Sequence, residues 1–423
     1  MSISRRSFIK GTAAATLLAD LTLVKQVAAE TASNHIQESA QKRGYRALKD
    51  DYSLDPNVLY LNHASIGTVP RVVQEAHIGY MRLCETNPWL YIWSAPWVEP
   101  QEIIRGKAAQ LMGCLPSETV LTHNTTECFN LLANGLPLGR GDEVLYSSLN
   151  HISASTCWHN LAPRRGFSVR SFHFPIADCT SLTADEIVSR YEREIGPNTR
   201  VLALPDIDNT VGIRHPLKAI ADMAHSKGVE WVVVDGAQSA GMVPIDLRDS
   251  GVDAYATSAH KWIQTPKGLG LAFLKTSLQA ALNPMWVKHT YSEESHPIQM
   301  YEDYSTRALP ALMAFGDALD YQAQTPLAER EAHHIHLWKE MQRIVANSDR
   351  LKWKSPTKWD ISAALYSVEV VGKPSSNIAS RLYEDHGIVV RPFTSDEINA
   401  IRISPNLIND VNDLEKIARV MAE

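Results

Sequence analysis

The sequence predicts an α/β fold, with a large, doubly wound, mainly parallel-sheet domain followed by a smaller C-terminal α+β domain. The first observation is that short β-branched runs, such as residues 231–234, alternate with stretches of helical periodicity and Gly/Asp turns. The second is that such a run can end abruptly in an acid, as at Asp235, which is typical of a buried parallel strand. The third is that the pattern breaks after Phe273, and the last third of the chain reads as a strand–helix–strand unit.

Length and charge narrow the class of protein. The 423 residues are enough for a large core and two domains. With 41 basic and 47 acidic residues, the net charge of −6 gives no sign of nucleic-acid binding, and 44% hydrophobic residues are typical of a soluble globular enzyme. We divide the chain into a signal peptide (1–29), an N-terminal arm (30–60), a large domain (61–305) and a small C-terminal domain (306–423).

The N-terminus has the form of a twin-arginine export signal. Arg5 and Arg6 lie in the stretch 4–10, an apolar stretch follows at 11–24, and residues 27–29 form a small-residue cleavage site. The apolar stretch is too short for a comfortable transmembrane helix. We therefore expect the twin-arginine machinery to export the protein to the periplasm. The resemblance to such signals implies export in the folded state.

The number and spacing of the cysteines argue against a disulfide framework and against a zinc site. Five is an odd number, and no CxxC spacing occurs, so a disulfide framework or a zinc site is not expected. Most of the cysteines are predicted to be small core residues, although an oxidising compartment leaves room for one disulfide. They are Cys84, Cys114, Cys128, Cys157 and Cys179.

The chain is organised around an aspartate and a lysine at two strand ends. Asp235 ends the run 231–235, and a second short strand, 253–257, delivers Lys261 between His260 and Trp262. Ligands of open α/β sheets collect outside such carboxyl ends. A lysine amine can form a Schiff base with the aldehyde of pyridoxal phosphate, and a carboxylate can keep the pyridine nitrogen of that cofactor protonated. The pair therefore predicts pyridoxal phosphate chemistry.

Two motifs carry a family resemblance. The runs Asp235-Gly236-Ala237-Gln238 and Ser258-Ala259-His260-Lys261 resemble the signature of class V aminotransferases. These are fold-type-I pyridoxal phosphate enzymes, and they include cysteine desulfurases and isopenicillin N epimerase. The resemblance covers roughly residues 56 to 420, and it implies pyridoxal 5′-phosphate as the cofactor.

A helix start at 122–127 is the predicted phosphate site. Asn124 can be the N-cap, with Glu127 reaching back to it. The free N–H groups and the positive dipole end of a helix N-terminus suit a phosphate group. The family places a threonine of this turn on the cofactor phosphate, so the resemblance assigns that role to Thr125 and Thr126.

The resemblance assigns further cofactor contacts. His151 follows the strand pattern 142–146 and matches a histidine that is stacked on the pyridine ring. Asn209 matches the family asparagine beside the phenolic oxygen, and Gln238 is expected to approach the same oxygen. Ser258 and His260 are expected to reach the phosphate.

Substrate contacts are expected from both ends of the chain. The run 59–67 resembles the opening of epimerase-type class V enzymes, where this segment reaches the substrate, so Asn62 and His63 are candidates. The C-terminal unit is predicted as a strand at 362–371, a helix at 376–386, and strands at 387–391 and 401–404. Arg391 and Arg402 fall at family positions near the substrate. Arg402 matches the arginine that binds a substrate carboxylate in the bidentate geometry particular to arginine.

A homodimer is expected from the pair Ser305-Thr306, which precedes a predicted helix at 311–322. The family has Gly-Thr here, and its threonine contacts the phosphate of the partner subunit. Thr306 matches, but Ser305 replaces a glycine and resists a positive φ angle. The aromatic run 88–97 is expected in the core or at a subunit interface, without a catalytic role.

A second predicted helix contains His333, His334 and His336. His333 and His336 share one face, which is one way to bind a metal ion. No third ligand is nearby in the sequence, so we expect a solvated helix face and no metal site.

The reaction class follows from what the sequence lacks as well as from what it has. Cysteine desulfurases of this family carry a nucleophilic cysteine after the Arg391 position, but here no cysteine occurs after Cys179. We expect an aminotransferase that acts on an amino acid or a peptide-like metabolite. The export signal and the fold resemble the periplasmic aminotransferases that mature siderophore peptides such as pyoverdine. The alternative is an isopenicillin-N-epimerase-like epimerase. A C–S lyase or a non-catalytic binding protein ranks lower.

Overall fold

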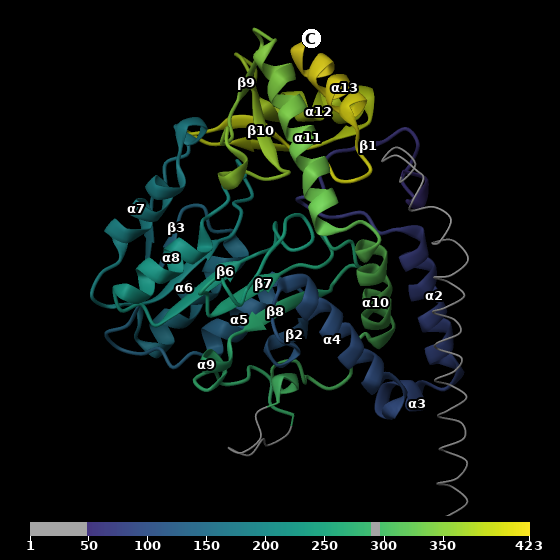
Figure 1. Ribbon diagram of the computed structural model, residues 1–423, viewed down its shortest axis with the longest axis vertical. Helices are drawn as coiled ribbons and strands as arrows, with labels where there is room; N and C mark the ends of the chain where they lie inside the picture. The colour runs from purple at the N-terminus through teal and green to yellow at the C-terminus, as the bar shows by residue number, and fades with distance from the viewer. Residues whose placement is uncertain (1–48, 289–296) are drawn as a thin grey trace, which may run out of the picture.

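A computed structural model describes residues 49–288 and 297–423 (Figure 1). The predicted signal peptide and most of the predicted arm lie outside these ranges, so those two predictions stay as they are. Among the helices that the structure describes, none has the length and apolar character needed to span a bilayer.

The large sheet has seven strands in the order β2-β8-β7-β6-β5-β3-β4. Neighbouring strands from β7 to β4 are parallel, whereas β8 is antiparallel to both of its neighbours. The predicted, mainly parallel sheet is therefore confirmed. Its strands are β2 (Thr119–Thr122), β3 (Glu143–Ser147), β4 (Ser168–Phe172), β5 (Thr199–Pro205), β6 (Trp231–Asp235), β7 (Ala254–Thr257) and β8 (Gly270–Leu274).

Helices cover both faces of this sheet. Successive residues of a strand point to opposite faces, so each strand contributes side chains to both cores. In β6, Val232 and Val234 share a core cluster with residues of α7 and α8, whereas Val233 packs in the cluster of α5 and α6. Helices α2, α4 and α10 extend the first cluster (Figure 1). The bounds are α2 (Arg71–Thr86), α4 (Val98–Met112), α5 (Thr125–Gly135), α6 (Ile152–Arg165), α7 (Ala184–Glu194), α8 (Leu217–Ser226) and α10 (Leu309–Ala323).

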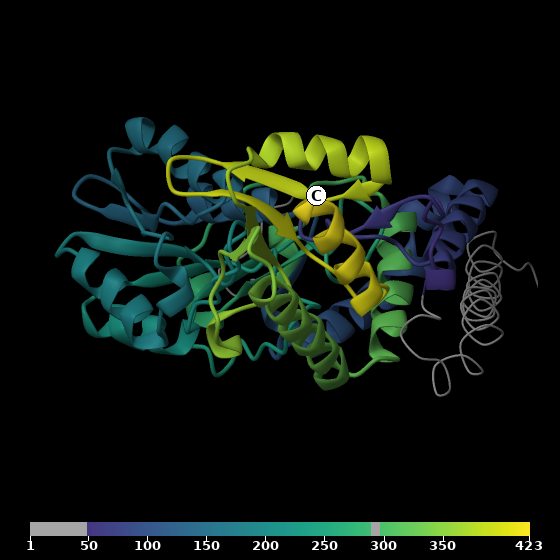
Figure 2. The same ribbon diagram turned by 90° about the horizontal axis from the view of Figure 1, so that it is seen from above.

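The C-terminal part forms a second, four-stranded antiparallel sheet in the order β12-β13-β10-β9, which lies over the large sheet (Figure 2). The predicted strand at 362–371 is shorter than expected, because residues 363–365 pack instead against Met242 and Trp262. The elements are α11 (Leu327–Ala346), β9 (Leu351–Trp353), β10 (Tyr366–Val370), α12 (Ser375–His386), β12 (Arg391–Thr394), β13 (Asn399–Ile403) and α13 (Val411–Ala422).

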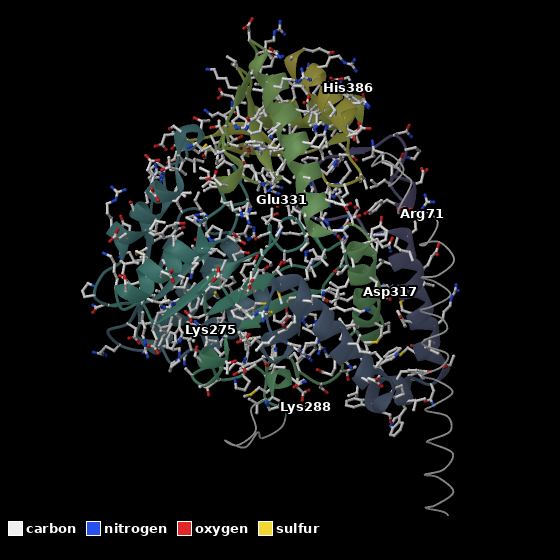
Figure 3. All side chains as sticks on the ribbon, in the orientation of Figure 1. Arg71, Lys275, Lys288, Asp317, Glu331 and His386 are labelled. Carbon is white, nitrogen blue, oxygen red and sulfur yellow. The ribbon has the colours of Figure 1, made fainter. Side chains whose placement is uncertain are left out.

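Contacts on two sides of the molecule join the C-terminal part to the rest of the chain. Strand β1 (Leu59–Tyr60) pairs in parallel with β11 (Ile388–Val389), and Asn62 bridges Ser404. On the other side, Glu331 of α11 (Figure 3) accepts a hydrogen bond from Trp359 and lies 3.7 Å from the guanidinium of Arg214. The segment that enters the site from the N-terminal side is therefore held by β11 and by the backbone just after β13.

The aromatic run and the cysteines divide between core and surface. Tyr91 and Trp97 are buried, whereas Trp89 and Trp93 of α3 (Pro88–Trp93) are 69% and 56% exposed. The prediction of a core position is therefore confirmed for Tyr91 and Trp97. All five cysteines are buried and free, which confirms that they are core residues.

The prediction of a solvated histidine face on α11 is wrong for His333 and His334. Both side chains are buried, and only His336 is exposed. His333 Nε2 lies 3.1 Å from the carbonyl oxygen of Asn409, and the ring of His334 packs edge-on against Trp262. The reason is that α11 contacts both parts of the molecule, so it has little solvent-facing surface at this point.

Candidate active site

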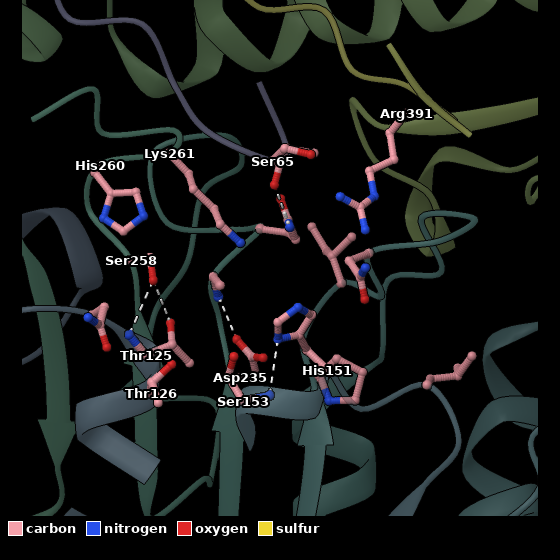
Figure 4. A pocket seen from close by; sticks show the side chains of 18 of the residues that line it. Ser65, Thr125, Thr126, His151, Ser153, Asp235, Ser258, His260, Lys261 and Arg391 are labelled. Carbon is pink, nitrogen blue, oxygen red and sulfur yellow. Dashed lines mark hydrogen bonds between the residues drawn. The ribbon is translucent and has the colours of Figure 1, made fainter. Parts of the chain in front are cut away.

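A pocket of about 340 Å³ lies at the carboxyl ends of β5, β6 and β7, and residues of β12 and β13 complete its wall (Figure 4). This is where an open α/β sheet binds its ligands. Of the residues predicted for the site, all except Asn62, His63 and Thr306 line the pocket. Those that do are Thr125, Thr126, His151, Asn209, Asp235, Gln238, Ser258, His260, Lys261, Arg391 and Arg402.

Asp235 is the last residue of β6 and is buried at the base of the pocket. Its Oδ1 accepts a hydrogen bond of 3.0 Å from the backbone N–H of Ala237. Burial raises the pKa of the carboxyl group, and the nearby Lys261 ammonium opposes that rise. The next residue, Gly236, has no room for a side chain, because a Cβ atom there would lie 1.9 Å from the ring of Tyr255. The strand end is thus fixed by close packing.

Lys261 reaches into the pocket from the turn after β7, close to Asp235 (Figure 4). Burial lowers the pKa of its amine to about 8, while the Asp235 carboxylate acts in the opposite direction. The backbone of Gly67 crosses over this turn, and its N–H donates to the carbonyl oxygen of His260. A lysine amine that is partly neutral near neutral pH can act as a nucleophile and as a base.

The start of α5 forms one end of the pocket. Asn124 caps the helix as predicted, because its side chain accepts from the N–H of Glu127. The Glu127 carboxylate does not reach back to Asn124; it accepts instead from the N–H of His123, one residue earlier. Thr125 Oγ1 lies 2.9 Å from Ser258 Oγ. The Thr125 and Ser258 hydroxyl groups thus meet the positive end of the α5 dipole at one point, which suits a phosphate group.

Two histidines flank the pocket in uncharged form. Burial lowers the pKa of His260 to about 4, and Lys261 adds to this effect. Burial also lowers the pKa of His151, although Asp235 opposes the shift. His151 Nδ1 accepts from the N–H of Ser153, which leaves the proton on Nε2. Figure 4 shows His151 across the pocket from Lys261.

Arg402 is buried and already holds several partners. Its Nη1 donates to the carbonyl oxygen of Asn209 over 2.7 Å, and its Nη2 donates to Asn62 Oδ1 and Ser65 Oγ over 3.0 and 2.7 Å. Burial lowers the pKa of the guanidinium to about 9, and Arg391 contributes, so Arg402 stays charged at neutral pH. Asn62 therefore positions Arg402 and does not itself line the pocket.

The prediction that His63 faces the substrate is wrong. Its side chain is fully buried, with the ring of Tyr60 packed edge-on against it. In an extended segment neighbouring side chains point in opposite directions, so Asn62 turns toward Arg402 and His63 turns into the core. Both ring nitrogens of His63 lack a hydrogen-bond partner within the described ranges.

Thr306 is exposed and lies away from the pocket of its own chain. Ser305 adopts a φ of +82°, in the left-handed region that favours glycine. The serine thus keeps the backbone turn, contrary to the expectation that it resists positive φ. A contact between Thr306 and a partner subunit stays a prediction.

Two residues that shape the site could not be predicted from the sequence. Ser65 lines the pocket and accepts from Arg402, and Phe393 packs against Arg402, with the guanidinium carbon 5.4 Å from the ring centre. Neither residue belongs to a spaced motif. Only the pairing of β12 with β13 and the path of the 59–67 segment bring them to the site.

These features define a fold-type-I pyridoxal phosphate enzyme, with an amine and a carboxylate at neighbouring strand ends and a phosphate site at a helix start. The family model described as "Aminotransferase class-V" matches residues 59–404, and the chain belongs to this family. Pyridoxal phosphate is its cofactor.

The relatives include more than one activity. An isopenicillin N epimerase from Streptomyces clavuligerus is 25% identical over 86% of this chain and 94% of its own length. A protein named "Probable cysteine desulfurase" from Pseudomonas aeruginosa is 29% identical over 84% of this chain and 91% of its own length. The apo cysteine desulfurase from Thermococcus onnurineus has a TM-score of 0.78 at 21% identity, covering 90% and 98% of the two chains, which shows the shared fold.

The residues present fit the cofactor. His260 Nδ1 is buried and has no hydrogen-bond partner among the described residues, so a polar group is needed beside it. It lies at the end of the pocket where Thr125 and Ser258 meet the start of α5. Asp235 provides a buried carboxylate for the protonated ring nitrogen, and Lys261 provides the amine.

Proposed function

We propose that this protein is an exported, pyridoxal phosphate-dependent aminotransferase that acts on an amino acid or a peptide-like metabolite. The observation that carries the proposal is the placement of Lys261 beside Asp235, with a neutral His151 opposite. Transamination needs one group that removes a proton from the substrate and returns it from the same side. Lys261 is suited to both steps.

The chain's own residues supply binding and proton transfer. Bound pyridoxal phosphate supplies an electron sink that stabilises negative charge on the substrate α-carbon. Thr125, Thr126 and Ser258 would hold its phosphate, and Asp235 would hold its ring nitrogen. Lys261, whose amine pKa is lowered to about 8, would accept the α-proton of the substrate and hold it on its own side of the pocket.

The other side of the pocket supports the choice. Epimerisation requires a second acid that returns the proton to the opposite side of the α-carbon. Across from Lys261 lies His151, and the family resemblance implies that its ring would stack on the cofactor, which would leave little room for a proton donor at the α-carbon on that side. The similarity to isopenicillin N epimerases over 94% and 97% of their length keeps an epimerase as the second candidate.

Two other reactions have less support. No cysteine lines the pocket, all five are buried, and none occurs after Cys179, so the nucleophile of a desulfurase is missing. A cystine C–S lyase solved with its product cysteine persulfide shares the fold at a TM-score of 0.78 and 23% identity. That likeness concerns the fold alone. A non-catalytic role would need the loss of Lys261 or Asp235, and both are present.

The test is a single-turnover experiment on the holoenzyme. An amino donor should bleach the visible absorbance of the cofactor by converting it to its amino form, and a keto acid should restore the absorbance. Chiral analysis of the recovered donor separates the two candidates. Inversion at the α-carbon, with no amino form produced, would favour the epimerase.

Export and a role in siderophore maturation belong to the same proposal. The support for export is the pair Arg5 and Arg6 before an apolar stretch and a cleavage site. The siderophore role rests only on the resemblance of this signal and fold to periplasmic aminotransferases that mature such peptides. Replacing both arginines with lysine should abolish the periplasmic pool in fractionated cells, because twin-arginine machinery reads the arginine pair. The unmodified chain serves as control, and an unchanged periplasmic pool would refute the targeting.

A further inference from the structure

Two arginines stand side by side at one end of the pocket. Arg391 of β12 and Arg402 of β13 are directly opposite each other in the strand register, so both side chains point to the same face. Like charges in this position repel and destabilise the strand pair unless an anion lies between them. The lowering of the Arg402 pKa by Arg391 reflects this proximity.

Phe393 keeps the two guanidiniums in place. It lies two residues after Arg391 on the same strand face, and the two guanidinium carbons are 5.6 and 5.4 Å from its ring centre. Such cation–π contacts orient a guanidinium without neutralising its charge.

No protein carboxylate neutralises this pair within the described ranges. Asp208 is the acid that acts on Arg402, but its oxygens accept the backbone N–H groups of Thr210, Val211 and Ile213. Arg391 is exposed, with neither a hydrogen bond nor an ion pair from the described residues. Its complete set of donors is therefore available to a ligand in the pocket.

The cofactor phosphate does not account for these charges either. Its site, at Thr125 and Ser258, lies across the pocket from Arg391 (Figure 4). The two arginines therefore face the part of the pocket that is left for the substrate.

We propose that Arg391 selects an amine substrate with two anionic groups. Arg402 holds the carboxylate beside the reacting amine through its Nε–H group, which has no hydrogen-bond partner among the described residues. Arg391 holds a second anionic group, such as a second carboxylate. This inference rests on the proposed function for the position of the amine, but the charge preference is a property of binding alone.

The experiment measures binding of amine-free probes to the holoenzyme, so no reaction is needed. Glutarate has two carboxylates, and its monoamide is nearly the same size with one. Calorimetric titration should give glutarate at least about tenfold tighter binding, the effect of one charge-assisted contact. Arg391→Gln should remove this preference and leave the affinity for the monoamide within about twofold.

Two further variants make the result specific. Arg391→Lys keeps the charge and loses the fork, so it should retain part of the preference. Arg419→Gln removes an exposed charge on α13, outside the pocket, and should keep the whole preference. Equal binding of both probes to the wild type, or an unchanged preference in Arg391→Gln, would overturn the inference. If the wild type prefers glutarate but the single-turnover test yields no amino form of the cofactor, the proposed aminotransfer is contradicted and the inference about Arg391 is not.

Discussion

At the level of single residues, the site depends on burial balanced by opposite charge. Lys261 and Asp235 are both withdrawn from water, which favours the neutral form of each, and each also favours the charged form of the other. The balance leaves the pKa of Lys261 at about 8. An amine in this range is a better base near neutral pH than an exposed lysine, whose pKa is about 10.4.

His63 gives a prediction for stability against pH. Burial lowers its pKa to about 3, so below pH 6.5 the unfolded chain takes up a proton that the native protein cannot take up until about pH 3. Stability is therefore lost as the pH falls through this window. At pH 5 the loss is about 2 kcal/mol.

Replacing His63 with Phe should remove this contribution. In urea unfolding at pH 7.5 and pH 5, the variant should lose about 2 kcal/mol less than the wild type between the two conditions. His336→Gln, a change on the exposed side of α11, is the control and should behave as the wild type. An equal loss in wild type and His63→Phe would show that His63 does not carry this acid sensitivity.

At the level of elements, the segment 62–67 and the turn after β7 are closely packed. A Cβ atom on Gly67 would lie 1.8 Å from the carbonyl oxygen of Lys261. We expect Gly67→Ala to destabilise the protein by about 2–3 kcal/mol and to weaken cofactor binding, because the turn that carries Lys261 must shift.

The matched control for this change is Gly106→Ala. Gly106 lies inside α4, and no heavy atom comes within 4 Å of an added Cβ atom there. That variant should be stabilised by about 0.5–1 kcal/mol, because alanine favours a helix over glycine. Thermal unfolding of both holoenzymes measures the difference, and equal stabilities would contradict the packing argument.

The elements also explain how much the sequence could reveal. Asp235 and Lys261 were predictable because carboxyl ends of parallel strands meet at one edge of a sheet. The helix start at Asn124 was predictable because a cap is a local feature. His63 was not, since a motif does not show which side of an extended segment each residue takes.

Other features depend on contacts between distant elements. The burial of His333 and His334 follows from the packing of α11 against both parts of the molecule. The pairing of Arg391 with Arg402 follows from the register of β12 and β13, and the occupied Nη atoms of Arg402 follow from the path of the 59–67 segment. A local sequence pattern predicts neither the register of two paired strands nor the path of a connecting segment.

At the level of the whole molecule, the proposed homodimer would complete each site with the partner's Thr306. Lys261→Ala and Thr306→Val should each reduce activity, the first by loss of the amine and the second by about tenfold weaker cofactor binding. A heterodimer of the two variants should regain one intact site, because the Thr306→Val subunit keeps its own Lys261 and receives an unchanged threonine.

The measurement is activity after mixing and reassociation, with sedimentation to confirm the dimer. Each variant mixed with itself is the control. Without any regain of activity in the mixed sample, or with a fully active monomer in sedimentation, the shared site would be ruled out.

The elements of the seven-stranded sheet carry the cofactor residues, and the C-terminal sheet carries the two arginines. The proposed chemistry also requires that Lys261, and no other lysine, faces the pocket. Lys267 is the natural rival. Burial lowers its pKa to about 8 as well, but its amine donates to the carbonyl oxygen of Gly67, and it does not line the pocket.

Borohydride reduction of the holoenzyme, followed by peptide mapping, tests the central claim most directly. Reduction fixes the cofactor covalently to the lysine that holds it, and mass spectrometry then identifies that residue. The account predicts the cofactor on Lys261, with no labelling of that peptide in Lys261→Ala. Cofactor fixed to Lys267 or to any other lysine would contradict it.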